Sequence, residues 1–238
     1  MKCSKLSVIV PAYNEEKTIG TILQTLLSVE LIGGLEMEIV VVNDCSRDGT
    51  EVAVEQFIAT HPNAAITYRK HTVNQGKGAA LHTGIREASG DLIVVQDADL
   101  EYDPREFNVL LQPILDGYAD VVYGSRFMGG KPHRILFFWH SIGNKFLTFL
   151  SNMFSNLNLT DMETCYKLVR ADYLKSLRLK EKRFGFEPEV TQKLSRIEGI
   201  RIYEVGISYY GRTYAEGKKI NWQDGLRAIY CIIRYGLF

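Results

Sequence analysis

The sequence lacks several features that would point directly to a function. Its four cysteines lie far apart, and none has the paired spacing of zinc or redox motifs. Lysine plus arginine equals aspartate plus glutamate at 28 each, so no overall basic field indicates nucleic-acid binding. No apolar run approaches the roughly 18 residues of a membrane span, and no signal-peptide pattern opens the chain. We therefore expect a cytoplasmic protein with reduced cysteines and without nucleic-acid partners.

Two nucleotide-binding motifs are also missing. The turn after the first predicted strand reads Pro11-Ala-Tyr-Asn-Glu15, not the Gly-x-Gly-x-x-Gly of dinucleotide dehydrogenases. It also lacks the glycine-rich loop that a sugar nucleotidyltransferase would carry there. The later segment Asn74-Gln-Gly-Lys-Gly78 places Lys77 near a helix N-terminus, but it is not a complete P-loop.

Strand and helix patterns alternate along the chain. With 238 residues and 46% hydrophobic content, the chain is expected to form one α/β domain with a C-terminal extension. The alternation predicts a largely parallel sheet flanked by helices. The predicted strands cover 6–10, 38–42, 65–68, 92–95, 120–124 and 164–169. The main predicted helices cover 19–27 (after an Asn14 cap), 52–58, 79–88 and 104–116.

The apolar strand at 92–95 is followed by two carboxylates, Asp97 and Asp99. Residues i and i+2 of an extended segment lie on the same side, so both carboxylates can converge at the strand end, where open α/β sheets bind ligands. Convergent carboxylates suit Mg²⁺ or Mn²⁺ bound to a substrate's phosphates. A solvated turn is the alternative, because Asp-x-Asp alone is common. The buried strand before it and the helix start at Asp103-Pro104 favour the metal site.

Other polar residues follow the remaining predicted strands. Asp44, after the second strand, would accept hydrogen bonds from a nucleotide's base or ribose; alternatively, Asp44 and Asp48 only stabilise their turn. A parallel sheet gathers its strand ends at one edge. The residues expected at that edge are Tyr13, Glu15, Asp44, Asp97, Asp99 and Arg126.

Five short motifs occur in a fixed order. They are Pro11-Ala-Tyr-Asn-Glu15, Asn43-Asp-Cys-Ser-Arg-Asp-Gly-Thr50, Asn74-Gln-Gly-Lys-Gly78, Asp97-Ala-Asp-Leu-Glu101 and Gly124-Ser-Arg126. In order and spacing they resemble the family-two inverting glycosyltransferases, especially the dolichyl-phosphate mannose synthases and bacterial polyprenyl-phosphate glycosyltransferases. The resemblance implies one GT-A-like, Rossmann-related catalytic domain over 1–238, with a nucleotide-sugar half (1–130) and an acceptor half (131–238). Asp161-Met-Glu-Thr-Cys-Tyr-Lys167 and the Arg212 region continue it less closely.

The resemblance also implies roles for matching residues. Asp97 and Asp99 would hold Mg²⁺ or Mn²⁺, and Glu101, where many relatives have Gln, would complete the metal sphere. Pro11, Tyr13, Glu15 and Asp44 would hold the nucleoside of a UDP- or GDP-hexose. The other residues assigned to substrates are Lys77, Ala98, Arg126, Arg134, Arg212 and Lys218. The segment Arg212-Thr-Tyr-Ala-Glu-Gly-Lys218 departs from the Arg-x-x-Gly-x-Ser-Lys of relatives at its Gly and Ser positions.

The acceptor decides whether a base is needed. A polyprenyl phosphate is already an anionic nucleophile, whereas the hydroxyl of a glycan or protein would require a general base. Asp161, or else Glu163, is the candidate base or acceptor-orienting group, and Asp161 alternatively caps the turn before the strand at 164–169. The sequence thus leaves three functions open: a polyprenyl-phosphate transferase, a soluble transferase to a hydroxyl, and a non-catalytic nucleotide-sugar sensor or scaffold.

Two amphipathic segments, 135–157 and 221–234, bear on the acceptor. Both carry aromatic and aliphatic residues with cations nearby, a pattern typical of helices lying at a bilayer interface. They predict peripheral contact with the inner face of the cytoplasmic membrane; packing on the sheet or in a homo-oligomer is the alternative. Glu187 or Glu189 would also contact a ligand, unless both only begin a helix near Pro188.

Overall fold

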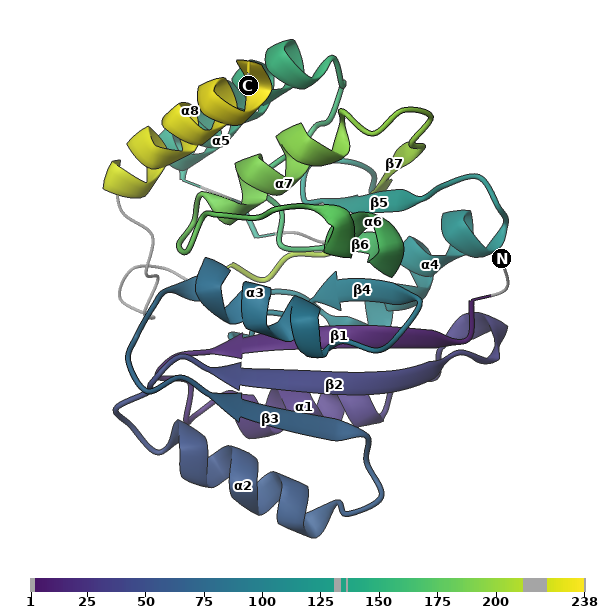
Figure 1. The fold of residues 1–238 in the computed structure, drawn as a ribbon, viewed down its shortest axis with the longest axis vertical. Coiled ribbons are helices and arrows are strands. Elements are labelled where there is room, and N and C mark those ends of the chain that lie inside the picture. Colours follow the sequence, from purple (N-terminus) through teal and green to yellow (C-terminus); the bar gives the residue numbers. More distant parts are fainter. Residues whose placement is uncertain (1–2, 131–133, 136, 212–221, 238) are drawn as a thin grey trace.

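The computed structural model describes residues 3–130, 134–135, 137–211 and 222–237. These residues form a seven-stranded sheet with helices on both faces; α3 lies in front of the sheet and α1 behind it (Figure 1). The strand order is β3-β2-β1-β4-β6-β5-β7. The strands are β1 (Lys5–Ala12), β2 (Glu36–Asn43), β3 (Ile66–Lys70), β4 (Leu92–Val95), β5 (Val121–Ser125), β6 (Lys167–Arg170) and β7 (Ile202–Gly206).

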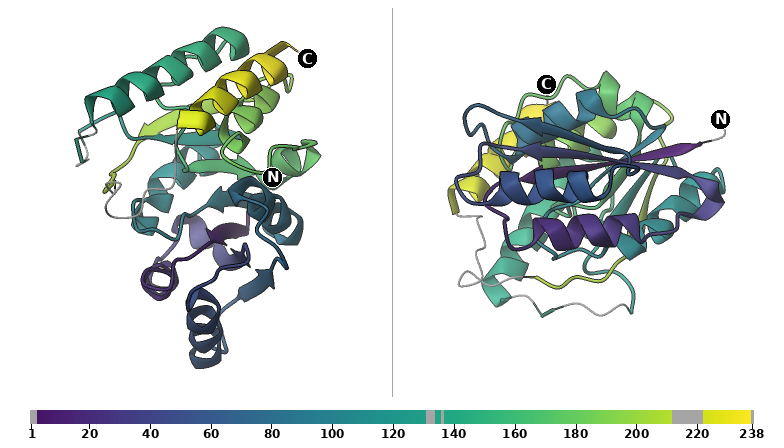
Figure 2. Two further views of the ribbon diagram at one scale, coloured as in Figure 1. Left: turned by 90° about the vertical axis from the view of Figure 1, so that its left-hand side faces the viewer. Right: turned by 90° about the horizontal axis from the view of Figure 1, so that it is seen from below.

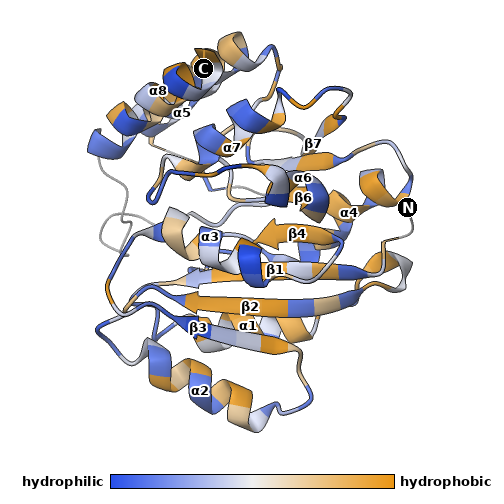
Figure 3. Cartoon of the chain, viewed as in Figure 1, coloured by the Kyte–Doolittle hydropathy of each residue, from blue (hydrophilic) through white to orange (hydrophobic). Residues whose placement is uncertain are grey.

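The sheet is mostly parallel, as predicted. β1 pairs in parallel with β2 and β4, β2 with β3, and β5 with β7. Every residue of β4 is buried, which fits an apolar run covered on both faces. Figure 3 shows the same apolar character in β2 and β4. The carboxyl ends of β1, β2 and β4 therefore lie together at one edge.

β6 is the exception, because it runs antiparallel to both β4 and β5. It also begins later than predicted, at Lys167 instead of residue 164. The reason is that the preceding polar groups bond to other partners: the Thr164 hydroxyl donates to the Gly124 carbonyl, and the Cys165 amide donates to the Tyr102 hydroxyl. The chain from the second half is thus inserted between β4 and β5.

The helices of the first half match the predicted ones apart from their ends. They are α1 (Ile19–Leu27), α2 (Thr50–Thr60), α3 (Lys77–Glu87) and α4 (Phe107–Leu115), with short 3₁₀ turns η1 (Ile32–Gly34) and η2 (Pro104–Glu106). The predicted cap at Asp103 is confirmed, since its side chain accepts a hydrogen bond from the Arg105 amide.

The predicted cap at Asn14 is wrong. Asn14 adopts a left-handed conformation with φ 53, and α1 begins only at Ile19, after Thr18. The Asn14 side chain accepts from the Arg47 amide, and its backbone amide donates to the Ser46 hydroxyl. Asn14 therefore joins the loops after β1 and β2, a use for which asparagine suits because it tolerates the left-handed region.

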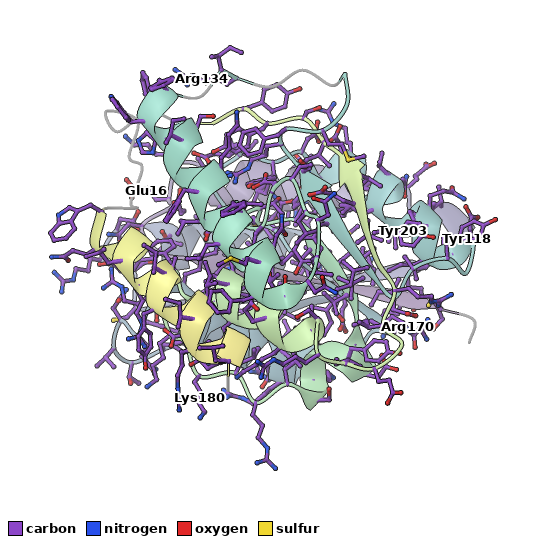
Figure 4. All side chains as sticks on the ribbon, turned by 90° about the horizontal axis from the view of Figure 1, so that it is seen from above. Glu16, Tyr118, Arg134, Arg170, Lys180 and Tyr203 are labelled. Carbon is purple, nitrogen blue, oxygen red and sulfur yellow. The ribbon has the colours of Figure 1, made fainter. Side chains whose placement is uncertain are left out.

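Three helices from the second half pack against one another beside the sheet. They are α5 (Phe138–Ser155), α7 (Phe186–Leu194) and α8 (Trp222–Leu237), while the short α6 (Ala171–Ser176) follows β6. Figure 2 and Figure 4 show α5 and α8 side by side. Helices α5 and α8 thus form within the two predicted amphipathic segments, and α8 continues beyond the second. Among the described residues, no helix combines the length and the apolar character needed to cross a membrane.

Candidate active site

A cavity of about 900 Å³ lies at the carboxyl ends of the parallel strands. It is bordered on its other side by α5, α8 and the segment before α7. The structure brings most of the predicted site residues together here. Those that line the cavity are Pro11, Tyr13, Glu15, Asp44, Lys77, Asp97, Ala98, Asp99, Glu101, Arg126 and Glu163.

Four predicted residues do not line it or cannot be placed. Asp161 lies behind the cavity wall, completely buried. Arg134, labelled in Figure 4 near the start of α5, donates to the Gly211 carbonyl at 2.7 Å. Arg212 and Lys218 lie outside the described residues.

Asp97 is held by a lysine. The Lys77 ammonium lies 2.7 Å from Oδ1 and 2.8 Å from Oδ2 of Asp97. Burial opposes the charge on Lys77, but the Asp97 carboxylate outweighs it and holds the pKa of Lys77 above its usual range. Asp99 accepts a hydrogen bond from the Glu101 amide. The cavity is therefore lined by the acidic pair Asp97 and Asp99, and Lys77 forms an ion pair with Asp97.

The three-carboxylate set expected for the metal is not formed. Glu101 accepts a hydrogen bond from the Tyr209 hydroxyl at 2.7 Å. Across the part of the chain that the structure describes, no three acidic, histidine or cysteine side chains group closely enough to hold a metal ion. Asp97 and Asp99 remain as a pair of cavity-lining carboxylates, which fits the way Mg²⁺ takes one or two carboxylates plus substrate phosphates.

Arg126 and Asp161 form a buried ion pair. Arg126 donates from Nε to Oδ2 of Asp161 at 2.6 Å, from Nη2 to Oδ1 at 2.7 Å, and from its backbone amide to Oδ2 at 3.1 Å. Burial opposes ionisation of Asp161, but the Arg126 charge and hydrogen bonds hold its pKa below the usual value. Because both oxygens are engaged, the geometry suits Asp161 to orienting Arg126 better than to accepting a substrate proton.

Asp44 both lines the cavity and stabilises its loop. Its carboxylate accepts from His71 Nδ1 at 2.7 Å and from the amides of Gln75 and Gly76. Asp48 accepts from the Thr50 amide and hydroxyl instead. The two alternatives for Asp44 are therefore compatible, because the loop contacts hold a carboxylate that still faces the cavity.

Comparison with known proteins bears on this geometry. Residues 7–178 match the family described as Glycosyl transferase family 2. The chain belongs to this glycosyltransferase family. An undecaprenyl-phosphate mannosyltransferase of Micrococcus luteus is 30% identical over 244 residues, covering 98% of this chain and 94% of that protein. A dolichyl-phosphate beta-glucosyltransferase of Trichomonas vaginalis is 29% identical over 98% of this chain and 73% of that protein.

A solved structure has the same fold. Glucosyl-3-phosphoglycerate synthase from Mycobacterium tuberculosis, in complex with Mn²⁺, UDP and phosphoglyceric acid, superposes with a TM-score of 0.71 at 20% identity. The match covers 98% of this chain and 79% of that chain. The expected GT-A-like α/β fold and the family resemblance are both confirmed.

Of the two candidate bases of this glycosyltransferase, Glu163 lines the cavity and Asp161 does not. The Oε1 atom of Glu163 is buried and makes no hydrogen bond to any described residue. Burial raises the pKa of Glu163 to about 7, although Lys167 opposes the rise. A protonated carboxyl near neutral pH can donate a hydrogen bond to a ligand oxygen.

We predict a pH-dependent effect for Glu163→Gln. The pKa of about 7 for Glu163 in the folded protein lies above the ~4.3 of an unfolded glutamate. The protonated side chain therefore stabilises the fold fully below about pH 4.3, and this stabilisation is lost as pH rises through 7. Glutamine cannot ionise. The stability of the Glu163→Gln variant relative to wild type should therefore increase by roughly 2 kcal/mol between about pH 5 and pH 8. This figure is reduced for solvent screening, because Glu163 lines the cavity. Urea unfolding at both pH values measures this, with exposed Glu198→Gln as control; a constant difference would contradict it.

Some cavity residues were not predicted. Tyr209, Phe184, Trp139 and Trp222 line it together with Arg183. The two tryptophans lie in the amphipathic segments, and Arg183 and Phe184 lie in the stretch 183–189, whose sequence departs from a regular helix pattern; Tyr209 lies in a segment without a recognisable pattern.

Of the two suspected glutamates, both in the first turn of α7, only Glu187 lines the cavity. It forms a buried ion pair with Lys167 at 2.5 Å. Glu189 accepts hydrogen bonds from the amides of Lys180 and Glu181, so it holds the segment before α7 in place. The observed contacts give Glu189 a structural role.

Proposed function

We propose that this glycosyltransferase transfers a hexose from a nucleotide diphosphate sugar to a polyprenyl phosphate, with inversion at the anomeric carbon and with a divalent cation. One observation carries the proposal: a single cavity joins the carboxylates at the strand ends to two helices that expose apolar side chains. A charged donor and an oily acceptor can therefore meet in the same space.

The donor end is suited to a metal-bound diphosphate. Asp97 and Asp99 would hold Mg²⁺ or Mn²⁺, and Arg126 and Lys77 would lie near the phosphates. The bound cation would neutralise negative charge on the departing nucleoside diphosphate. The Mn²⁺ and UDP in the complex of the structurally similar synthase support this assignment.

The acceptor end is suited to a lipid. We use the term apolar helix face for the large apolar side chains of α5 and α8 that are more than a third exposed. They are Phe138, Trp139, Ile142, Phe146, Phe149, Met153, Trp222, Leu226, Tyr230, Ile233 and Leu237. The inner side of α5 carries the buried Thr148, Ser151 and Ser155, together with the partly buried Leu147, Leu150 and Phe154, which pack against the core.

An ordinary amphipathic helix exposes only its polar side, whereas α5 and α8 expose large apolar side chains and also bury others, such as Ile232. This exposure is typical of helices that lie in the headgroup region of a bilayer. Trp139 and Trp222 belong both to the apolar helix face and to the cavity lining. A polyprenyl chain in the membrane would thus extend its phosphate into the cavity, and the protein would lie peripherally on the cytoplasmic side.

A phosphate acceptor also agrees with the state of the acidic residues. Both oxygens of Asp161 accept hydrogen bonds from Arg126, so Asp161 is poorly placed to act as a general base. A polyprenyl phosphate oxygen needs none, because it is already ionised when it attacks the anomeric carbon. The names of the mannosyl- and glucosyltransferase relatives support this acceptor class.

The test is transfer of radiolabel from UDP- and GDP-sugars into an organic phase containing a polyprenyl phosphate, with Mg²⁺ or Mn²⁺. Lipid-dependent labelling that EDTA abolishes would establish the reaction and identify the sugar. Metal-dependent hydrolysis of the donor without lipid labelling would favour a hydroxyl acceptor. Nucleotide binding without turnover would favour a sensor or scaffold.

We predict that charge on the apolar helix face reduces membrane binding. Phe138 and Phe149 are 67% and 65% exposed, so replacing either with Glu should leave the fold intact. Each variant should lower cosedimentation with anionic liposomes several-fold, because a charge opposes burial among headgroups and acyl chains. Tyr118→Glu is the matched control, an aromatic residue 61% exposed and far from α5 and α8 (Figure 4). Loss of folding in the Phe variants would indicate a core role instead.

A further inference from the structure

The Lys77–Asp97 contact has the geometry of a cation bound to a carboxylate. The ammonium touches both oxygens of Asp97, at 2.7 and 2.8 Å, on the cavity lining. A divalent ion held by Asp97 would need at least one of these oxygens. Lys77 and the ion would therefore compete for the same carboxylate.

The backbone around Lys77 is closely held. Gly76 has φ +98, and a Cβ there would lie 2.5 Å from the Lys182 carbonyl oxygen. A Cβ on Gly78 would lie 2.3 Å from the Glu181 carbonyl oxygen. The Ala79 amide donates to the Lys182 carbonyl at 3.0 Å. Since only glycine fits on either side, the close packing fixes where the Lys77 side chain begins.

We propose that Lys77 takes the place of the divalent cation on Asp97 in the donor-free protein, so that the cation enters together with the nucleotide diphosphate and Lys77 then transfers to the phosphates. This inference rests on the proposed function of the same cavity. It makes Lys77 a positioning residue that sets the order of binding.

Charge explains both why the free cation binds weakly and why Lys77 moves to the phosphates when the donor binds. In the donor-free protein, Lys77 cancels one of the two charges that Asp97 and Asp99 offer to a metal, so a free ion is bound weakly. A diphosphate brings negative oxygens of its own, which supply ligands for the ion and a new partner for Lys77. Lys77 is the first residue of α3, where the amides at the helix N-terminus also favour a phosphate.

The experiment is a calorimetric titration of the whole protein with Mn²⁺, without nucleotide. Lys77→Met removes the competing charge and should tighten Mn²⁺ binding on the order of tenfold. Lys77→Gln removes the charge but keeps a hydrogen-bond donor for Asp97, and should show the same direction if the methionine variant folds poorly. Lys77→Arg should remain close to wild type. Lys70→Met is the matched control, because Lys70 pairs with Glu51 on the surface, at 2.6 Å.

A second titration uses Mn²⁺ with UDP or GDP. Lys77→Met should bind the metal nucleotide several-fold more weakly than wild type, since it lacks the cation that would meet the phosphates. Adding Asp97→Asn to Lys77→Met should remove the gain in affinity for Mn²⁺ alone. Unchanged Mn²⁺ affinity in both folded Lys77→Met and Lys77→Gln would overturn the exchange. Lipid labelling by wild type tests the proposed function separately, so the two can fail independently.

Discussion

Replacing Asp97 with Asn is expected to abolish metal-dependent sugar transfer, lowering kcat/KM at least about a hundredfold. The amide has the same shape as the carboxylate but offers no negative charge to a cation on the donor's diphosphate. Asp99→Asn should act in the same direction, because Asp99 lines the same cavity two residues later. Radiolabel transfer at saturating Mg²⁺ or Mn²⁺ measures the loss.

The control separates catalysis from folding. Asp116→Asn changes an exposed aspartate after α4 that does not line the cavity, and should retain wild-type transfer. Circular dichroism should show that both cavity variants remain folded. Unchanged turnover in Asp97→Asn would remove this residue from the metal site and, with it, the proposed mode of donor binding.

The first half of the chain could be predicted well because its information is local. Parallel strands such as β4 are continuous apolar runs, and each is followed by a polar turn that marks its end. Parallel strand ends meet at one edge, so Asp44 and Asp97 could be placed together without knowledge of side-chain contacts.

The second half depends on contacts between distant residues. An apolar run does not reveal strand direction, so the antiparallel insertion of β6 between β4 and β5 had no local signal. β7 was missed because it is only partly buried and mixes Tyr203 and Glu204 with aliphatic residues. Glu204 nevertheless accepts from the amides of Thr160 and Asp161, and so helps hold the carboxylate beside Arg126.

The predicted roles at the site divide in the same way. Residue type and motif order suggested that Asp97 and Asp99 face a ligand, and both line the cavity. The sequence placed Asp161 before Glu163 as the candidate base, because it could not show that Asp161 pairs with Arg126, 35 positions away. Asp161 is buried beside Arg126, which lowers its pKa. Glu163 is buried with no hydrogen bond from any described residue to Oε1, and its pKa is raised.

Replacing Asp161 with Asn should destabilise the protein by about 3–5 kcal/mol, since removing one member of a buried ion pair leaves the other charge uncompensated. The side chains of Arg126 and Asp161 are only 12% and 0% exposed. The lowered pKa of Asp161 means that its stabilisation is present above the unfolded value of ~3.9 and is lost as pH falls through the folded pKa. The cost of the substitution should therefore be largest near neutral pH and shrink in acid.

Urea unfolding at neutral and acidic pH measures this cost. Asp120→Asn is the matched comparison, because its partner Arg201 is 50% exposed and can return to water, so the loss should be smaller. The double variant Asp161→Asn with Arg126→Gln should lose less than the two single variants added together, since no charge is left buried alone. Strict additivity would contradict the pairing, and sugar transfer that survives in folded Asp161→Asn would exclude Asp161 as a base.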